Sequence, residues 1–137
     1  MNQDIINKMF ETKDGVRTVK QYGCAYSHWH RTLGKEYYQT DIDHVEYRIG
    51  RGIVAIIDTT SNFQNEGHII NAKKYVWMRN KVQVSVLKQT SNALGVPAYY
   101  VFHTNDFTVF HVHDLSKPLE EYTAMNERQY KEFIWNL

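Results

Sequence analysis

Carboxylates spaced along two β-rich runs are the residues of this sequence best suited to chemistry. Asp41 and Asp43 are two residues apart at the start of the first run, so on a strand their side chains point to the same face. Asp58 ends the apolar run that follows, where it comes back beside Asp43. Carboxylates from adjacent strands suit a hard divalent cation such as Mg²⁺, which takes oxygen ligands and leaves positions for a phosphate. In the alternative interpretation, Asp41 and Asp43 are only the exposed start of a strand.

Histidines form a second candidate metal site. His111 and His113 alternate along an expected strand and therefore share a face, and His103 lies on the strand before it. Three imidazoles converging from two strands could hold Zn²⁺ with an open coordination position. Alternatively, residues 111–113 form a solvent-facing edge of a sheet, with Val112 pointing inward.

Basic residues suited to a phosphate track surround the acids. One group lies around the acidic runs, and a denser group follows them together with Tyr75 and Trp77, whose rings could stack on exposed bases. Alternatively, the second group is a solvated helix face with two core aromatics. From both groups we predict four nucleic-acid-binding residues, which are Arg51, Lys73, Lys74 and Arg79.

A β-hairpin is expected to position the acids. The run 41–49 alternates polar and apolar residues, residues 50–52 form a glycine-containing turn, and the apolar run 53–59 returns. The second run is apolar on both faces, so we expect it to be more central in the sheet than the first. Residues 61–67 are polar and loop-like, and residues 69–77 form either an inserted helix or an irregular excursion.

The segments on either side of the hairpin are predicted to contain helices. Residues 1–10 carry apolar side chains at helical spacing, and a second helical stripe runs from residue 16 to residue 33, closed by Gly34. Helices are also predicted over 81–94 and, capped by Asn126, at the C-terminus. The expected buried face of the helix over 81–94 consists of Val82, Val86, Leu87, Thr90, Ala93 and Leu94.

Two further strands, over 98–102 and 107–113, complete the expected pattern. Helices mixed with a few strands are typical of an α/β fold. We therefore predict a single domain over residues 1–137, built as a three-layer sandwich in which helices flank a small mixed β-sheet.

The order of these features resembles the PD-(D/E)XK nuclease superfamily, the restriction-endonuclease-like group that includes archaeal Holliday-junction resolvases and RecB-type nucleases. The resemblance extends over roughly Tyr26 to His113. It rests on Asp43 in an Ile-Asp-His-Val-Glu context, a turn, an apolar strand ending in Asp58, and a helix with Gln83 near its start. It implies that Asp43 and Asp58 bind Mg²⁺ or Mn²⁺, that Gln83 supports the site, and that the protein acts on DNA rather than RNA as a homodimer.

The sequence departs from the family pattern at Thr60. The family places a Lys two residues after the second acid, and that acid is usually Glu rather than the Asp58 found here. A Thr hydroxyl can form a hydrogen bond, but it brings no positive charge to the transition state. Either another lysine has taken over, with Lys73, Lys74 and Lys81 as candidates and Lys81 counted among our predicted catalytic residues, or the domain no longer cuts.

The composition limits the classes of function. Sixteen Lys and Arg against fifteen Asp and Glu give a net charge of +1, which excludes a strongly basic nucleic-acid coat and an acidic DNA mimic. A single Cys24, no signal peptide and no apolar run of membrane-spanning length favour the cytoplasm, or the host cytoplasm if the protein is viral. We expect a metal-dependent nuclease that hydrolyses phosphodiesters in DNA and has no membrane contact. The alternative is a catalytically inactive, nuclease-fold module that binds nucleic acid or protein.

Overall fold

The computed structural model describes residues 11–12, 15–16 and 25–137. The chain forms two compact units, an N-terminal unit, Met1–Asp41, and a C-terminal unit, Ile42–Leu137. Organisation as one domain over the whole chain stays a prediction.

The described residues of the N-terminal unit form two short strands and a short helical segment. β1 (Glu11–Thr12) pairs antiparallel with β2 (Gly15–Val16). α3 (Ala25–His30) continues directly into one 3-10 turn, η1 (Arg31–Leu33). This segment ends before Gly34, which has a φ of +122° and closes the helix as the sequence predicts. The helix expected over the first ten residues, and the part of the second stripe formed by residues 17–24, lie outside the described residues.

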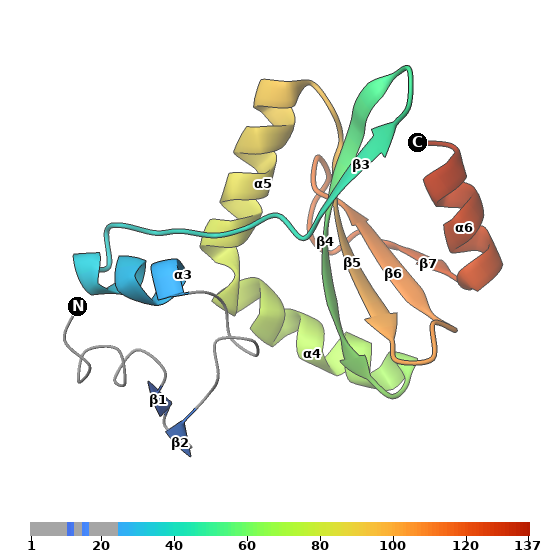
Figure 1. The fold of residues 1–137 in the computed structure, drawn as a ribbon. Coiled ribbons are helices and arrows are strands. Elements are labelled where there is room, and N and C mark those ends of the chain that lie inside the picture. The colour runs from blue at the N-terminus through green and yellow to red at the C-terminus, as the bar shows by residue number, and fades with distance from the viewer. Residues whose placement is uncertain (1–10, 13–14, 17–24) are drawn as a thin grey trace. The chain divides into compact units, whose positions relative to one another are not determined.

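A five-stranded mixed sheet forms the centre of the C-terminal unit, in the order β3-β4-β5-β6-β7 (Figure 1). β4 and β5 run parallel, and every other neighbouring pair is antiparallel. The predicted hairpin is β3–β4, and β4 lies inside the sheet while β3 forms its edge. The strands are β3 (His44–Arg48), β4 (Gly52–Phe63), β5 (Ala98–Thr104), β6 (Phe110–Asp114) and β7 (Thr123–Met125).

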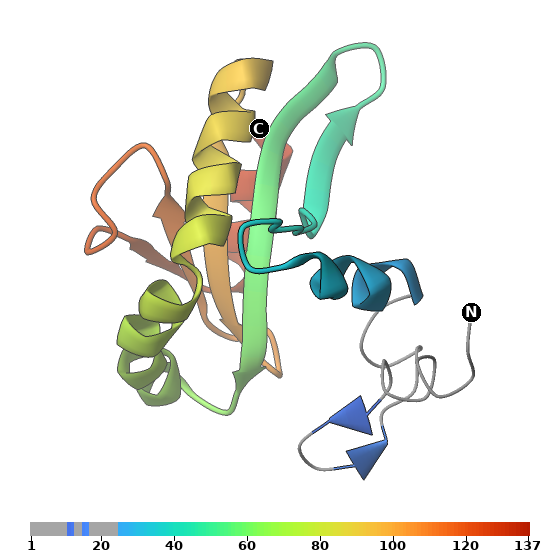
Figure 2. The same ribbon diagram turned by 90° about the vertical axis from the view of Figure 1, so that its left-hand side faces the viewer.

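Helices cover both faces of this sheet. α4 (Glu66–Arg79) and α5 (Lys81–Leu94) lie on one face, and α6 (Glu127–Trp135) lies on the other (Figures 1 and 2). Consecutive residues of β5 enter the two cores, because Val101 packs on the α6 side and Phe102 packs on the α4–α5 side. The three layers confirm the predicted α/β sandwich. Within the described residues, no helix is long and apolar enough to cross a membrane.

Several element boundaries can be compared with the prediction. β4 continues to Phe63, so the start of the expected loop is still strand. Residues 69–77 lie within α4, which confirms the helix and not the irregular excursion of the two interpretations. The Asn65 side chain caps that helix by accepting a backbone N–H. α5 has the predicted bounds, and α6 has the predicted cap, Asn126, in a reciprocal capping box with Gln129.

The face of α5 that meets the sheet differs from the predicted one. Leu87 is buried as predicted, and Val84 is buried although it was not expected to be. Three residues expected to be buried are exposed, which are Val82 (50%), Leu94 (47%) and Ala93. Gln83 also lies on the buried side of the helix, where its side chain bonds a strand residue. A purely apolar pattern misplaces this face because one of the side chains that turns toward the sheet is polar.

Candidate functional site

Asp43 and Asp58 lie side by side on the β3–β4 hairpin. His44 pairs with Ile57 in the antiparallel register, so the residue before His44 comes next to the residue after Ile57. The backbone N–H of Asp43 donates a hydrogen bond to Asp58 Oδ1 at 3.0 Å. In the other direction, Asp43 Oδ2 accepts hydrogen bonds from the backbone N–H of Thr59 at 2.9 Å and from its hydroxyl at 3.2 Å. The structure thus brings together the two residues predicted to bind metal.

Gln83 reaches this pair from α5. Its side-chain Nε2 donates a hydrogen bond to Asp58 Oδ2. Asp58 is 1% exposed, so its carboxylate is buried between the sheet and α5, whereas Asp43 is exposed just before β3. The hydrogen bonds from Gln83 and from the Asp43 backbone fix the orientation of a buried carboxylate next to an exposed one.

Three uncharged side chains, those of Thr60, Tyr100 and Asn80, form a hydrogen-bonded group next to Asp58. Thr60, which stands where the resemblance implies a Lys, has its Oγ1 2.6 Å from the hydroxyl oxygen of Tyr100. Asn80, at the junction of α4 and α5, donates a hydrogen bond from Nδ2 to the same oxygen at 3.1 Å. Burial raises the pKa of Tyr100, and the negative charges of Asp58 and Asp43 raise it further, although the hydrogen bonds with Thr60 and Asn80 oppose this shift. The phenol therefore keeps its proton at neutral pH.

The side chains gathered here fit a hard cation in their chemistry. Asp43 and Asp58 offer carboxylate oxygens, which Mg²⁺ and Mn²⁺ prefer as ligands. No group of three or more His, Cys, Asp and Glu side chains in the described part of the chain could hold a metal ion. Mg²⁺ is commonly held by one or two carboxylates, with water and substrate phosphate completing its shell. The pair therefore suits a cation that takes most of its ligands from water and phosphate.

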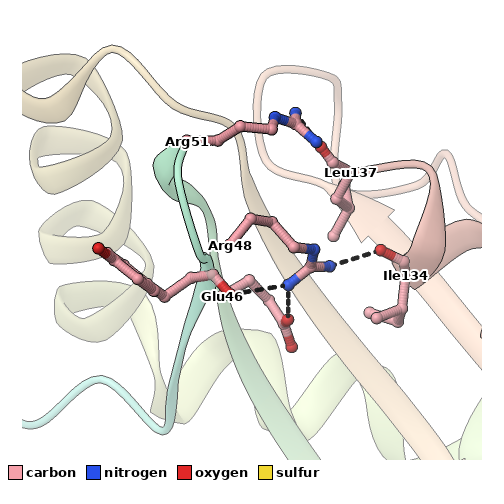
Figure 3. A network of polar contacts seen from close by, with 6 residues as sticks. Glu46, Arg48, Arg51, Ile134 and Leu137 are labelled. Atoms are coloured by element: carbon pink, nitrogen blue, oxygen red, sulfur yellow. Dashed lines mark hydrogen bonds and ion pairs between the residues drawn. The ribbon is translucent and has the colours of Figure 1, made fainter.

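Four of the predicted basic residues lie on the surface. Lys74 and Arg79 are exposed on α4, and Lys81 is exposed at the start of α5. Arg51, in the hairpin turn, donates a hydrogen bond to the backbone carbonyl of Leu137 at 3.0 Å (Figure 3). Their predicted roles in catalysis or in binding nucleic acid stay predictions.

Lys73 is not on the exposed side of α4. It belongs to a group of side chains between α4 and the sheet, which we name the Tyr122 cluster. Lys73 Nζ lies 3.3 Å from the centroid of the Tyr122 ring. His111 stacks on that ring with the centroids 4.5 Å apart, and its Nε2 lies 3.0 Å from Glu66 Oε1. His113 also packs against Tyr122, with the ring centroids 5.3 Å apart. These five residues make up the cluster, and both histidines are almost completely buried.

Burial controls the charge states in the Tyr122 cluster. It lowers the pKa of Lys73 to about 8, although the negative charge of Glu66 opposes the shift. Burial, and then the positive charge of Lys73, lowers the pKa of His113 to about 4 and also lowers that of His111. The backbone groups of Leu119 and Glu121 act to raise the pKa of His113, but neither forms a hydrogen bond with its ring nitrogens. At pH 7 the cluster therefore holds a charged lysine against two neutral imidazoles.

The structure overturns the three-histidine metal site. His103 pairs with Phe110, whose side chain belongs to the core on the α6 side, whereas His111 and His113 face α4. The three imidazoles therefore cannot converge, and no such metal-binding group occurs in the described residues. The solvent-facing alternative is also wrong, because β6 lies between β5 and β7 and both of its faces are covered.

Trp77 does not have the exposed position that base stacking requires. Its ring packs edge-on against Tyr100 at 5.0 Å, against Phe102 at 5.2 Å and against His113 at 5.0 Å between centroids. Trp77 is therefore a core residue, as in the alternative interpretation of its segment. Tyr75 is 67% exposed and remains a candidate for stacking on a base.

Sequence reasoning missed Tyr100 and Asn80. Tyr100 is the parallel register partner of Asp58, a relationship that joins two strands separated by two helices. The available signal was the pair of Tyr hydroxyls, Tyr99 and Tyr100, near the start of the strand that follows α5. Asn80 separates the two helices, and its polar side chain gave no indication that it would turn toward the sheet. Neither partner could be derived without the parallel pairing of β4 and β5.

Comparison of the chain with protein-family models, with curated proteins and with solved structures finds no match.

Proposed function

We propose that this protein is a metal-dependent, nuclease-like enzyme that hydrolyses phosphodiester bonds, in DNA rather than RNA, with Mg²⁺ or Mn²⁺. The observation that carries the proposal is the contact of Asp43 with Asp58 on adjacent strands, with Gln83 holding the buried carboxylate. A cation bound there would activate water and neutralise charge that develops on the phosphate. A homodimer and a cytoplasmic location stay predictions from the sequence.

Each residue of the pair has a separate part in this proposal. Asp58 is buried and oriented by the Asp43 N–H and by Gln83, so it would present a fixed oxygen donor. Asp43 is exposed, so its carboxylate would meet the cation from the solvent side, where a phosphate enters. The exposed Lys74 and Arg79 on α4 would contact the backbone phosphates of the nucleic acid.

A cleavage assay tests this proposal. Branched, single-stranded and duplex DNA would be incubated with the protein and either Mg²⁺ or Mn²⁺. Asp43→Ala and Asp58→Ala should each lower the rate by at least about 100-fold. Glu120→Gln alters an exposed carboxylate in the loop between β6 and β7, and this variant should cut at the wild-type rate. Equal rates in all these variants would rule out the two-carboxylate site.

One observation favours a second function, a nuclease-like module that binds without cutting. Thr60 contacts the uncharged Tyr100 hydroxyl, so this position beside Asp58 lacks the positive charge that the resemblance implies. Under this alternative, wild-type protein would bind DNA with an affinity that falls steeply as salt rises, because phosphate contacts release counterions. It would leave every DNA substrate intact with either metal.

A further inference from the structure

The Tyr100 hydroxyl lies at the boundary between the carboxylate pair and the core. The residue is 2% exposed, and it is the register partner of Asp58 on the neighbouring strand. Thr60 lies two residues after Asp58, so both side chains leave the same face of β4. The Tyr100 hydroxyl contacts Thr60 of β4 at 2.6 Å and accepts a hydrogen bond from Asn80, which lies between α4 and α5. It therefore links β4 to the layer of helices.

The direction of the hydrogen bonds follows from the donors present. An amide nitrogen can only donate, so Asn80 donates to the Tyr100 oxygen. The contact with Thr60 can run either way, but a buried phenol proton without an acceptor is costly, and Thr60 Oγ1 accepts it at 2.6 Å. Tyr100 therefore donates to Thr60, which leaves the Thr60 proton to be donated to a third group.

The phenol must keep its proton to donate to Thr60. Burial raises the pKa of Tyr100 and the carboxylates of Asp58 and Asp43 raise it further, while the hydrogen bonds with Thr60 and Asn80 oppose the shift. The phenol therefore remains protonated at neutral pH. Thr60 itself is only partly buried, whereas Tyr100 is buried.

We infer that Tyr100, held by Asn80, is a positioning residue that fixes the Thr60 hydroxyl as a neutral donor toward the water or phosphate oxygen taken up beside Asp43 and Asp58. The inference rests on the proposed nuclease function. A donor of fixed direction orients an oxygen as an ammonium group would, but it does not offset charge in the transition state. The arrangement therefore predicts slow metal-dependent cleavage.

Matched tyrosine variants test the inference. Tyr100→Phe removes the hydroxyl and keeps the ring that packs on Trp77. Tyr99→Phe makes the same change on the opposite face of β5, where the ring packs on Phe133. Thr60→Val removes the hydroxyl at the other end of the contact. For each variant, Mn²⁺ affinity is measured by electron paramagnetic resonance, cleavage by single-turnover kinetics at saturating DNA, and stability by thermal unfolding.

We expect Tyr100→Phe and Thr60→Val each to lower the single-turnover rate about tenfold while leaving Mn²⁺ affinity unchanged. The double variant should be no slower than the slower single variant, because both changes break the same contact. Tyr99→Phe should cut at the wild-type rate. A structural role alone would lower the unfolding temperature of Tyr100→Phe without slowing the folded protein.

Two results would overturn the inference and leave the proposed function intact. One is a wild-type cleavage rate in Tyr100→Phe, and the other is full additivity of the losses in the double variant. By contrast, a wild-type protein that cuts no DNA with Mn²⁺ or Mg²⁺ would overturn the proposed enzymatic function together with the inference. The wild-type measurement therefore distinguishes the two failures.

Discussion

The backbone N–H of Asp43 donates a hydrogen bond to Asp58 Oδ1 at 3.0 Å, while the Asp43 carboxylate accepts one from the backbone of Thr59. These two hydrogen bonds join the residue just before β3 to β4, at the end of the hairpin opposite the turn. Hydrogen bonds to a buried charged group stabilise a fold, and losing one partner leaves the other without compensation. Asp58 consequently stabilises the hairpin in addition to its proposed part in metal binding.

Asp58→Ala is expected to lower the free energy of unfolding by about 2–4 kcal/mol without any metal present. The reason is that the Asp43 N–H and the Gln83 amide both lose a buried acceptor. Asp58→Asn should cost less, because its amide oxygen can still accept from Asp43. Urea denaturation in the presence of a chelator measures these differences. Asp58→Ala as stable as wild type would contradict the buried network, and Glu120→Gln is the control that should change little.

Thr60→Lys is expected to raise the rate of metal-dependent cleavage about tenfold, because a charge-assisted donor is stronger than a neutral one. The new ammonium would leave β4 on the same face as Asp58 and would offset charge beside the carboxylates. Ser61→Lys adds the same charge one residue further along β4, where the strand leaves its regular pairing with β5, and should leave the rate unchanged. Single-turnover kinetics with Mg²⁺ measures both. A Thr60→Lys protein no faster than wild type would contradict the role given to this position.

Arg48→Met is expected to lower the free energy of unfolding by about 1 kcal/mol, because Arg48 holds the C-terminal helix to the hairpin. Its guanidinium donates to Glu46 at 2.8 Å and to the backbone carbonyl of Ile134 at 2.6 Å (Figure 3). Hydrogen exchange should show faster opening of α6 in particular. Arg128→Met, which removes an exposed arginine from α6 itself, is the matched control. Unchanged protection of α6 in Arg48→Met would show that the apolar face of the helix suffices.

The carboxylate pair could be predicted because its geometry depends on local sequence. Gly50 and Gly52 both have positive φ, at 83° and 91°, so the turn between the two β-rich runs is encoded in the residues themselves. Once the turn is fixed, the antiparallel register brings Asp43 back to Asp58. The place of Gln83 beside the pair was implied only by the family resemblance, because periodicity gave the bounds of its helix but a buried face that left Gln83 out.

The Tyr122 cluster could not be predicted because it depends on contacts between distant elements. α4 turns Lys73 and Trp77 toward the sheet, so its inner face is not the uniform apolar stripe that marks an amphipathic helix. His111 and His113 alternate with an apolar residue as in a half-exposed strand. Their burial follows from β7, a three-residue strand too short to recognise, and from Tyr122 just before it.

His113 is expected to make the protein less stable as the pH falls from about 6.5 toward 4. Its pKa is lowered to about 4 in the fold, chiefly by burial and then by the charge of Lys73, whereas an unfolded histidine titrates near its ordinary value of about 6.5. Below that pH the unfolded chain takes up a proton that the folded chain excludes, so the unfolding free energy falls by roughly 1.4 kcal/mol per pH unit. Lys73 stays charged throughout this range, and the lowered pKa of His111 acts in the same direction.

His113→Phe should flatten this pH dependence, because the ring still packs on Trp77 but no longer titrates. His103→Phe makes the same substitution on the opposite face of the sheet, where the His103 ring stacks on Phe107, and it should keep the wild-type slope. Urea denaturation between pH 4 and pH 7.5 measures all three proteins. Parallel stability curves for wild type and His113→Phe would contradict the prediction. Such a result would mean that His113 takes up its proton at about the same pH in the folded protein as in the unfolded chain, so that its protonation does not change the unfolding free energy.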